Sequence, residues 1–564
     1  MKTKFTAVAA MALLGCGMAM AQSNDVETRA LHDEMQRSLK DLHLDAHPQP
    51  YFIAYKIVDV EQMEARASFG ALTNSGVNRS RILSVDVRIG DYNFDSSNYV
   101  NRSAGLGSLF GAISNVTNLI LPVDDSYEEL RRKIWLATDS AYKKAVEDYS
   151  GKKAALAARG RDEESTPDFS KAEAREESDL LPPVAMDMAH AEALVKATSA
   201  MFRNLPEGET SSAVFAVTST TEHFLNSEGT SYTKRIPEVS FRATASLQNP
   251  TGETFSDSVS EYGHALSDMP DDAKLSAEVK AVDEQLTARL KGKVARRYNG
   301  PVLMEGQAAA VLFARDFANQ LSSNAQAGTA ASLISSMLAA PTSSMINKVG
   351  TRVLPDFLSV ENNPLLTQSD GHALLGSYKF DEEGIPAQET VLVKDGILKT
   401  LLSSRKPARG IHASTGSMRE KGVAPGNLIV DSSKGATRDE LKQQLVALIG
   451  QRSLEYGYIV RRLSGNAAVE AVRVFPDGRE ELVRDARIAA VNTASFKDVL
   501  AASKDRTVYT DVAAGSSLLG AALGGTGDLT TYVVPDMLFE DMEVEHVTNS
   551  TPKLPVVPSP LSGQ

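Results

Sequence analysis

Cysteine is almost missing from this sequence, and its scarcity excludes several kinds of chemistry. Cys16 is the only cysteine among the 564 residues. It lies in an N-terminal segment that has the features of a cleaved leader. Without that segment, the chain has no disulfide, no thiolate metal ligand and no cysteine nucleophile. A chain of this length can form a sufficient hydrophobic core without such cross-links.

Clusters of basic residues and long internal apolar runs are missing as well. The formal net charge is −13, and binding to a phosphate backbone requires grouped lysines and arginines. We find no such group, so nucleic acid is not an expected partner. After the N-terminal segment, no run of about 18 apolar residues occurs, which predicts no transmembrane helix in the rest of the chain.

Residues 1–21 have the pattern of a secretory signal peptide. A basic MKTK precedes the apolar stretch FTAVAAMALLGCGM, and the small-residue triplet AMA stands directly before Gln22. This order predicts cleavage after Ala21 and a periplasmic or secreted protein. An alternative treats LLGC as a lipobox and acylates Cys16, although Leu14 fits that motif poorly.

The patterns of the first half predict two units that mix helices and strands. Residues 25–115 begin with a helical pattern and continue with alternating, β-branched stretches, which predicts an N-terminal α+β domain. Residues 122–295 combine long helical patterns with strands that turn at NSEG, and form a middle helix and strand domain. A charged connector, 158–180, interrupts this middle domain.

The second half predicts a large mixed domain, rich in strands, over residues 299–546. It opens at 300–323 with GPVLMEGQAAAVLFARDFANQLSS, an apolar strand that runs into an amphipathic helix. Asp395-Gly396 marks a hairpin turn, and residues 437–440, TRDE, form a capping box before another helix. We expect 325–346 to be a packed helix and 547–564 a flexible tail. The predicted fold class is therefore α+β.

No complete catalytic motif is present. The sequence has neither a G-x-S-x-G nucleophile elbow nor a phosphate-binding loop. Ser403-Ser-Arg-Lys406 fits S-x-x-K, but the further motifs that this chemistry needs are missing. Of the scattered histidines, His372 and His412 are the two that remain as weak candidates for metal ligands.

Several stretches from residue 226 onward, taken in order, resemble a known family. They are NSEGT, YNGPVL, GTRVLPDFLSVENNP, YKFDEEGIPAQETVLVKDGILKTLL, RGIHASTGSMRE and APGNLIV. In order and spacing they resemble the TldD/PmbA family, whose active members are zinc metallopeptidases. The likeness covers most of the chain after residue 25 and is strongest over 298–450.

This resemblance implies a choice between two kinds of member. TldD-type members carry HExxxH on the helix after the VL strand, with a distant cysteine completing the metal site, whereas PmbA-type (TldE) members keep the fold and lack the motif. An ungapped alignment places Phe313, Ala314 and Ala318 at the three motif positions. A shifted register uses Met304, Glu305 and Ala309 instead. Phenylalanine and alanine have no lone pair for zinc, so no catalytic or metal-binding residue is expected here.

The resemblance therefore favours a non-catalytic PmbA/TldE-type subunit of a metallopeptidase complex that acts on unfolded peptides. The expected partner is a TldD-like HExxxH subunit, with or without self-association, and any zinc would lie in that partner. Two alternatives stay open. One is an autonomous zinc metallopeptidase with relocated ligands such as His372 and His412, and the other is a non-enzymatic exported binding or scaffold protein.

Overall fold

The computed structural model describes most of the chain. The described residues are 25–45, 47–99, 116–159, 166–205, 208–249, 252–323, 343–420, 422–489, 491–512 and 528–546. The expected signal peptide, nearly all of 325–346 and the expected tail at 547–564 lie outside these residues. In the described part, no helix combines the length and the apolar character needed to cross a membrane.

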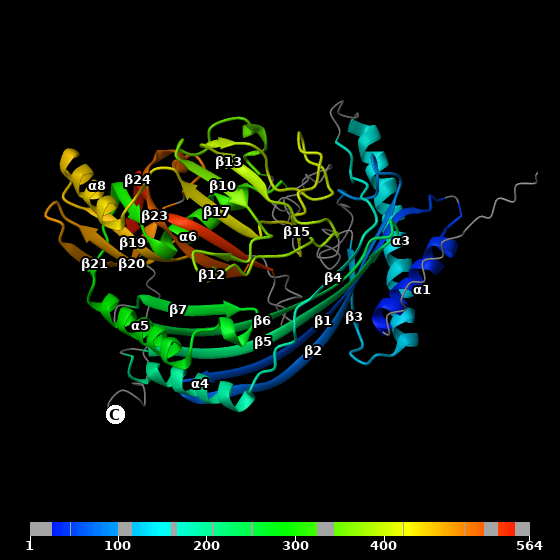
Figure 1. Ribbon diagram of the computed structural model, residues 1–564, viewed down its shortest axis with the longest axis horizontal. Helices are drawn as coiled ribbons and strands as arrows, with labels where there is room; N and C mark the ends of the chain where they lie inside the picture. The colour runs from blue at the N-terminus through cyan, green and yellow to red at the C-terminus, as the bar shows by residue number, and fades with distance from the viewer. Residues whose placement is uncertain are drawn as a thin grey trace, which may run out of the picture.

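The N-terminal half forms one curved sheet of seven strands, in the order β3-β2-β1-β5-β6-β4, with β7 added to β6 (Figure 1). The strands are β1 Pro50–Ser68, β2 Ala71–Ile89, β3 Val116–Leu121, β4 Glu176–Leu180, β5 Gly208–Asn226, β6 Ser231–Gln248 and β7 Thr254–Gly263. Strands β1 and β5 pair antiparallel from Ala54 to Ala67 of β1. The units predicted at 25–115 and 122–295 therefore share a single sheet.

Helices cover one face of this sheet. They are α1 Val26–Asp41, α3 Tyr127–Arg159, α4 Met188–Ala200 and α5 Asp272–Lys291. Because strand side chains alternate between faces, Ile53, Tyr55 and Ile57 of β1 share a face and pack against α1 and α3. Ala65 and Ala67, on the same face further along, pack in the core that includes α4 and α5.

The C-terminal half is built on a second sheet, of 13 strands. Its main strands are β8 Lys293–Val294, β9 Tyr298–Met304, β10 Leu358–Asn362, β13 Thr390–Lys394, β14 Ile397–Leu398, β17 Asn427–Ser432, β18 Gly435–Ala436, β19 Gly457–Ser464, β20 Ala467–Val474, β21 Glu480–Arg484, β22 Ala486–Ile488, β23 Val499–Val512 and β24 Leu529–His546. Two small hairpins, β11 Gln368–Ser369 with β12 His372–Ala373 and β15 Met418–Arg419 with β16 Gly422–Val423, lie outside this sheet.

Five of these strands close into a barrel. Each pairs with the next in the cycle β24, β9, β19, β20, β22 and back to β24. Helices α6 Gly306–Asp316 and α8 Arg438–Gln451 pack on this framework. Figure 1 shows the C-terminal half over the concave side of the N-terminal sheet, away from α4 and α5.

Local sequence signals located several of these elements. Asp395 and Gly396 both have positive φ, 48° and 77°, in the tight turn between β13 and β14, as the Asp-Gly pair predicts. Thr437 and Glu440 form the predicted capping box of α8. The charged connector differs from expectation at its end, where β4 pairs in parallel with β6.

Candidate functional site

The first candidate site is the region around α6, where the resemblance would place metal ligands. Strand β9 is buried and ends at Met304, and α6 begins at Gly306, whose φ is 55°. The Gly306 N–H donates to the carboxylate of Asp536 at 2.7 Å, which satisfies one of the unpaired donors at the start of a helix. The alanine-rich helix ends at Asp316.

Aromatic side chains fill the space beside this helix. Phe313 and Phe317 stack with ring centroids 5.1 Å apart. Phe496 lies 5.9 Å from Phe313 and 5.1 Å from Phe317, and Phe539 lies 5.5 Å from Phe496. All four rings are fully buried. The interior here has the close packing of an ordinary hydrophobic core.

The residues present at the motif positions do not fit a zinc ion. Phe313, Ala314 and Ala318 are buried, and none has a donor atom in its side chain. Ala318 also lies beyond the end of α6, in the short 3-10 turn Ala318–Gln320. In the shifted register the one possible ligand is Glu305, and its carboxylate pairs with Arg461 at 3.0 Å.

The structure does not bring the histidine candidates into a metal site. His372 lies in β12, His412 lies in a loop, and both side chains are exposed. Among the described residues, no group of three or more His, Cys, Asp or Glu could hold a metal ion.

Ser403 and Lys406 also do not pair. The Ser403 hydroxyl donates to the backbone oxygen of Ala413 at 2.7 Å, while burial and the charge of Arg88 lower the pKa of the Lys406 amine.

Charged residues gather instead at the contact between the N-terminal sheet and the C-terminal half. Lys56 of β1 and Lys234 of β6 both bind Glu382, at 2.7 Å and 2.5 Å. Lys234 also contacts Glu222 of β5 at 3.1 Å. Burial opposes the charge of each lysine, but the facing carboxylates outweigh it and raise the pKa of both amines. This four-residue group, the Glu382 cluster, ties the two halves together.

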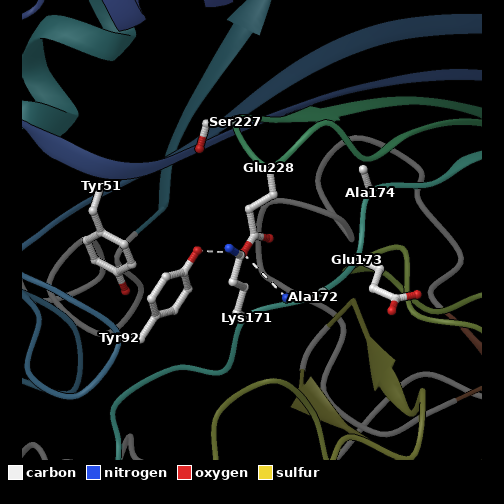
Figure 2. Close-up of a pocket in the computed structure, with 8 residues that line it drawn as sticks. All are labelled: Tyr51, Tyr92, Lys171, Ala172, Glu173, Ala174, Ser227 and Glu228. Atoms are coloured by element: carbon white, nitrogen blue, oxygen red, sulfur yellow. Dashed lines mark hydrogen bonds between the residues drawn. The ribbon is translucent and has the colours of Figure 1, made fainter.

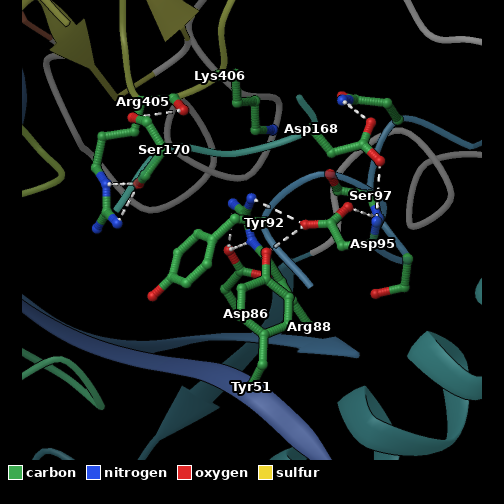
Figure 3. Close-up of polar contacts among 12 residues, drawn as sticks. Tyr51, Asp86, Arg88, Tyr92, Asp95, Ser97, Asp168, Ser170, Arg405 and Lys406 are labelled. Carbon is green, nitrogen blue, oxygen red and sulfur yellow. Dashed lines mark hydrogen bonds and ion pairs between the residues drawn. The ribbon is translucent and has the colours of Figure 1, made fainter. Parts of the chain in front are cut away.

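A second buried group lies along the same contact (Figure 3). Arg405, from the C-terminal half, forms an ion pair with Glu228 at 2.7 Å and donates to the backbone oxygen of Ser170 at 2.9 Å. Its guanidinium carbon lies 4.1 Å from the ring centre of Phe169, and that of Arg88 lies 3.7 Å from the same ring. Cation–π contacts of this kind gain strength when they are desolvated.

A pocket of about 690 Å³ opens beside this group (Figure 2). It is lined by Tyr51, Tyr92, Lys171, Ala172, Glu173, Ala174, Ser227 and Glu228. Its main buried carboxylate, Glu228, accepts from Tyr92 at 2.7 Å and is paired with Arg405. Since its best-placed polar groups already bind each other, the pocket shows no set of free catalytic groups.

Sequence reasoning missed both charged groups. Lys56 and Glu382 are 326 residues apart, and no local pattern links a lysine in a strand to a glutamate in a distant loop. The sequence offered one signal: Glu382 lies in YKFDEEG, one of the stretches that carry the family resemblance. The low exposure of this glutamate is unusual, because most glutamates lie at the surface.

Comparison with curated proteins finds metalloproteases. A metalloprotease of Archaeoglobus fulgidus is 27% identical over 165 residues, 24% of this chain and 37% of that protein. A metalloprotease of Methanocaldococcus jannaschii is 36% identical over 78 residues, 14% of this chain and 16% of that protein. The chain therefore matches well under half of the length of these relatives.

Solved structures share the fold over nearly the whole chain. TldE from Thermococcus kodakarensis superposes with a TM-score of 0.55 and 13% identity, covering 92% of this chain and all of that one. A proposed modulator of DNA gyrase from Thermotoga maritima gives a TM-score of 0.58 and 13% identity, covering 91% and 100%. At this identity the likeness shows the fold alone.

A family model identifies the C-terminal half. Residues 298–546 match the PmbA/TldA metallopeptidase C-terminal domain. This range contains the closed barrel, α6 and the loop that carries Glu382. The α+β fold with a strand-rich C-terminal region agrees with the prediction. Residues 298–546 are therefore a C-terminal domain of the PmbA/TldD metallopeptidase family.

Proposed function

We propose that this protein is an exported, non-catalytic PmbA/TldE-type subunit that assembles with a TldD-type metallopeptidase acting on unfolded peptides. One observation carries the proposal. In a domain of a metallopeptidase family, the positions that align with HExxxH belong to a core of four fully buried phenylalanine rings and alanine. A hydrolytic zinc site needs three protein ligands and a base for the bound water, and these residues supply none of them.

Apolar filling also explains how such a subunit stays folded. A pocket of unoccupied carboxylates and imidazoles would bury polar groups without partners, which costs free energy. Phe313 and Phe317 remove that cost, because they fill the volume with groups that prefer burial. The fold is thereby kept as a scaffold, and the export signal predicted at residues 1–21 would place it outside the cytoplasm.

The experiment is a metal analysis combined with a peptidase assay. The mature chain, purified without chelator or histidine tag, is analysed by elemental mass spectrometry and assayed on an unfolded peptide. We expect close to zero zinc per chain and no chelator-sensitive cleavage. Co-expression with an HExxxH-containing relative should give a complex whose cleavage activity is lost when the relative's motif glutamate is replaced by glutamine.

Each rival predicts a different result. Zinc near one per chain, together with cleavage that is lost in a His372→Ala/His412→Ala variant, would establish an autonomous metallopeptidase and overturn the proposal. A chain without zinc that does not co-purify with the HExxxH relative would indicate a non-enzymatic binding or scaffold protein. The matched control is His264→Ala, a histidine whose ring contacts only the backbone oxygen of Pro237 among the described hydrogen bonds.

A further inference from the structure

Two methionines and a histidine come together where α4 begins. Residues 186–190 read MDMAH. Asp187 is the N-cap of α4, and its carboxylate accepts a hydrogen bond from the backbone N–H of His190 at 3.2 Å. Met186 directly precedes the cap, and Met188 is the first residue of the helix. The cap therefore fixes the backbone that carries two thioether sulfurs and one imidazole.

The two methionines flank one small, buried side chain. The residue before an N-cap often packs against the fourth residue of the helix, which here is Ala191. Residues three apart lie on one face of a helix, so Met188 also neighbours Ala191, which is 1% exposed. Met186 and Met188 are only partly buried where they pack on the core beneath α4, whereas Met304 and Met537 are fully enclosed. The two side chains at the start of α4 therefore remain accessible from solvent.

The start of α5 supplies the neighbouring groups. The Nε2 of His190 lies 3.4 Å from the carboxylate of Asp272, in the first turn of α5. Met269 stands three residues before Asp272, and it is partly buried against the same core as Met186 and Met188. Figure 1 shows α4 and α5 on the side of the sheet opposite the C-terminal half. The two helices thus bring a third methionine close to the histidine.

The contact with Asp272 suits a histidine that binds a metal. Metal-binding histidines usually donate the other ring N–H to a carboxylate, which fixes the tautomer and the orientation of the ring. With Nε2 directed to Asp272, the Nδ1 of His190 forms no hydrogen bond with any residue that the structure describes. Asp187 and Asp271 are the N-caps of α4 and α5. Their charges offset the positive ends of both helices, which would otherwise repel a cation.

We propose that the thioethers of Met186, Met188 and Met269, together with the Nδ1 of His190, form a surface site for copper(I). Soft thioether sulfur selects copper(I), imidazole also suits copper, and carboxylates and water suit magnesium and calcium. Zinc sites are built from thiolate, imidazole and carboxylate ligands, so a site with three thioethers discriminates against zinc. This proposal does not depend on the assignment of a non-catalytic function, because the site lies outside the C-terminal domain.

The test is a competition titration with copper(I). The mature chain, without a histidine tag and with Cys16 absent or replaced by serine, is titrated anaerobically against the chromophoric chelator bicinchoninate. We expect the wild type to withhold about one copper(I) per chain from the chelator. Met188→Leu and Met269→Leu keep an apolar side chain of similar volume. Each should weaken binding by at least about tenfold, since even the outer partners of metal ligands are worth about 10–100-fold in affinity.

The matched control lies at the other end of the same helix. Met201 follows α4 and is partly buried against the same core, so Met201→Leu should bind copper(I) like the wild type. Copper(I) should raise the melting temperature of the wild type and of Met201→Leu, but not that of Met188→Leu. His190→Gln, at a side chain that is 55% exposed, tests the site without disturbing the core.

Each other outcome contradicts the proposal. It is overturned if the wild type yields all its copper(I) to the chelator, or if Met188→Leu, Met269→Leu and His190→Gln all bind as the wild type does. Equal weakening by Met201→Leu, which would reflect a general loss of packing, also overturns it. So does displacement of copper(I) by an equal concentration of zinc(II), because that would show a site without preference for a soft ion.

Discussion

Two buried regions of this protein solve the problem of burial in opposite ways. Beside α6, four phenylalanine rings pack together, and none of these four side chains carries a charge. At the contact between the two halves, Lys56, Lys234, Glu222 and Glu382 are largely withdrawn from solvent, and their opposite charges pair with each other. The first region contains the positions that the family resemblance aligns with the HExxxH motif. The second region instead holds the two lysines and two glutamates of the Glu382 cluster, which connect the halves.

The difference shows what burial of charge signifies in this chain. Strongly perturbed titratable groups often mark active sites, but ion-pair networks perturb pKa values as well. In the Glu382 cluster each amine faces a carboxylate within 3.1 Å, and Glu382 binds both lysines. A network with its partners satisfied fixes a geometry, whereas catalysis requires a group free to react. The cluster therefore supports the placement of the halves.

The aromatic core should show the largest effect of a single substitution. Phe496→Ala removes the ring that contacts three other buried phenylalanines, and we expect a loss of about 3–5 kcal/mol in the free energy of unfolding, because a cavity remains. Urea denaturation measures it. Phe475→Ala is the matched control, since that ring is only partly buried, and it should cost clearly less. Equal losses would mean that the region around α6 is not tightly packed.

The sequence predicted the first region better than the second. The core around α6 follows from a local pattern, an apolar strand followed by a helix with Phe313 and Phe317 on its inner side. The turn at Asp395-Gly396 and the cap at Thr437 are also local. The pairing of β1 with β5, which merges two expected units into one sheet, joins residues 146 to 172 positions apart, from Ala67 with Ala213 to Ala54 with Asn226. The Glu382 cluster depends on that pairing, so it could not be predicted before the sheet was known.

A substitution that breaks the Glu382 cluster should cause the second-largest loss in the free energy of unfolding. Glu382→Gln leaves two buried amines with Glu222 as their remaining carboxylate within the cluster, and we expect a loss of about 3 kcal/mol, the low end for breaking a buried ion pair. Lys379→Gln is the control, because it removes another ion pair between the halves, the one between Lys379 and Asp179. The Lys379 side chain is 68% exposed. This substitution should cost less than about 1 kcal/mol. If the two variants lose the same stability, burial does not distinguish these pairs.

Substitution of Lys406, which lies in the same contact, should not destabilise the fold and can stabilise it. Its amine is buried near Arg88, and burial together with that positive charge lowers its pKa. Replacing a poorly compensated charge by an apolar side chain of similar length removes a desolvation cost. Lys406→Met should therefore leave the free energy of unfolding unchanged or raise it by up to about 1 kcal/mol. A loss comparable to that of Glu382→Gln would show that Lys406 is a fully satisfied member of the contact.

The comparison also predicts where the protein responds to pH. The aromatic core has no titratable group, but α1 is held to the sheet by Asp25, whose carboxylate contacts His223 at 2.9 Å. Burial opposes the charge of His223, yet the hydrogen bond and the charge of Asp25 outweigh it and raise its pKa. Burial, together with a hydrogen bond that the protonated Glu27 donates to the Asp25 carboxylate, raises the pKa of Glu27 from 4.5 to about 7.

Both raised pKa values make the attachment of α1 less stable as the pH rises. A raised histidine pKa stabilises the fold below about pH 6.5, and that stabilisation is lost as the pH rises through the folded value. A glutamate with a folded pKa of about 7 and an ordinary value of 4.5 loses its contribution as the pH rises between these two values. The attachment of α1 should therefore weaken from about pH 5 to pH 7.5. Limited proteolysis within residues 26–41 measures it, and a Glu27→Gln/His223→Gln variant should be cleaved at a rate that changes much less over this range. If wild type and variant share one pH profile, the sensitivity lies elsewhere, and the contrast between the apolar core and the charged contacts does not extend to α1.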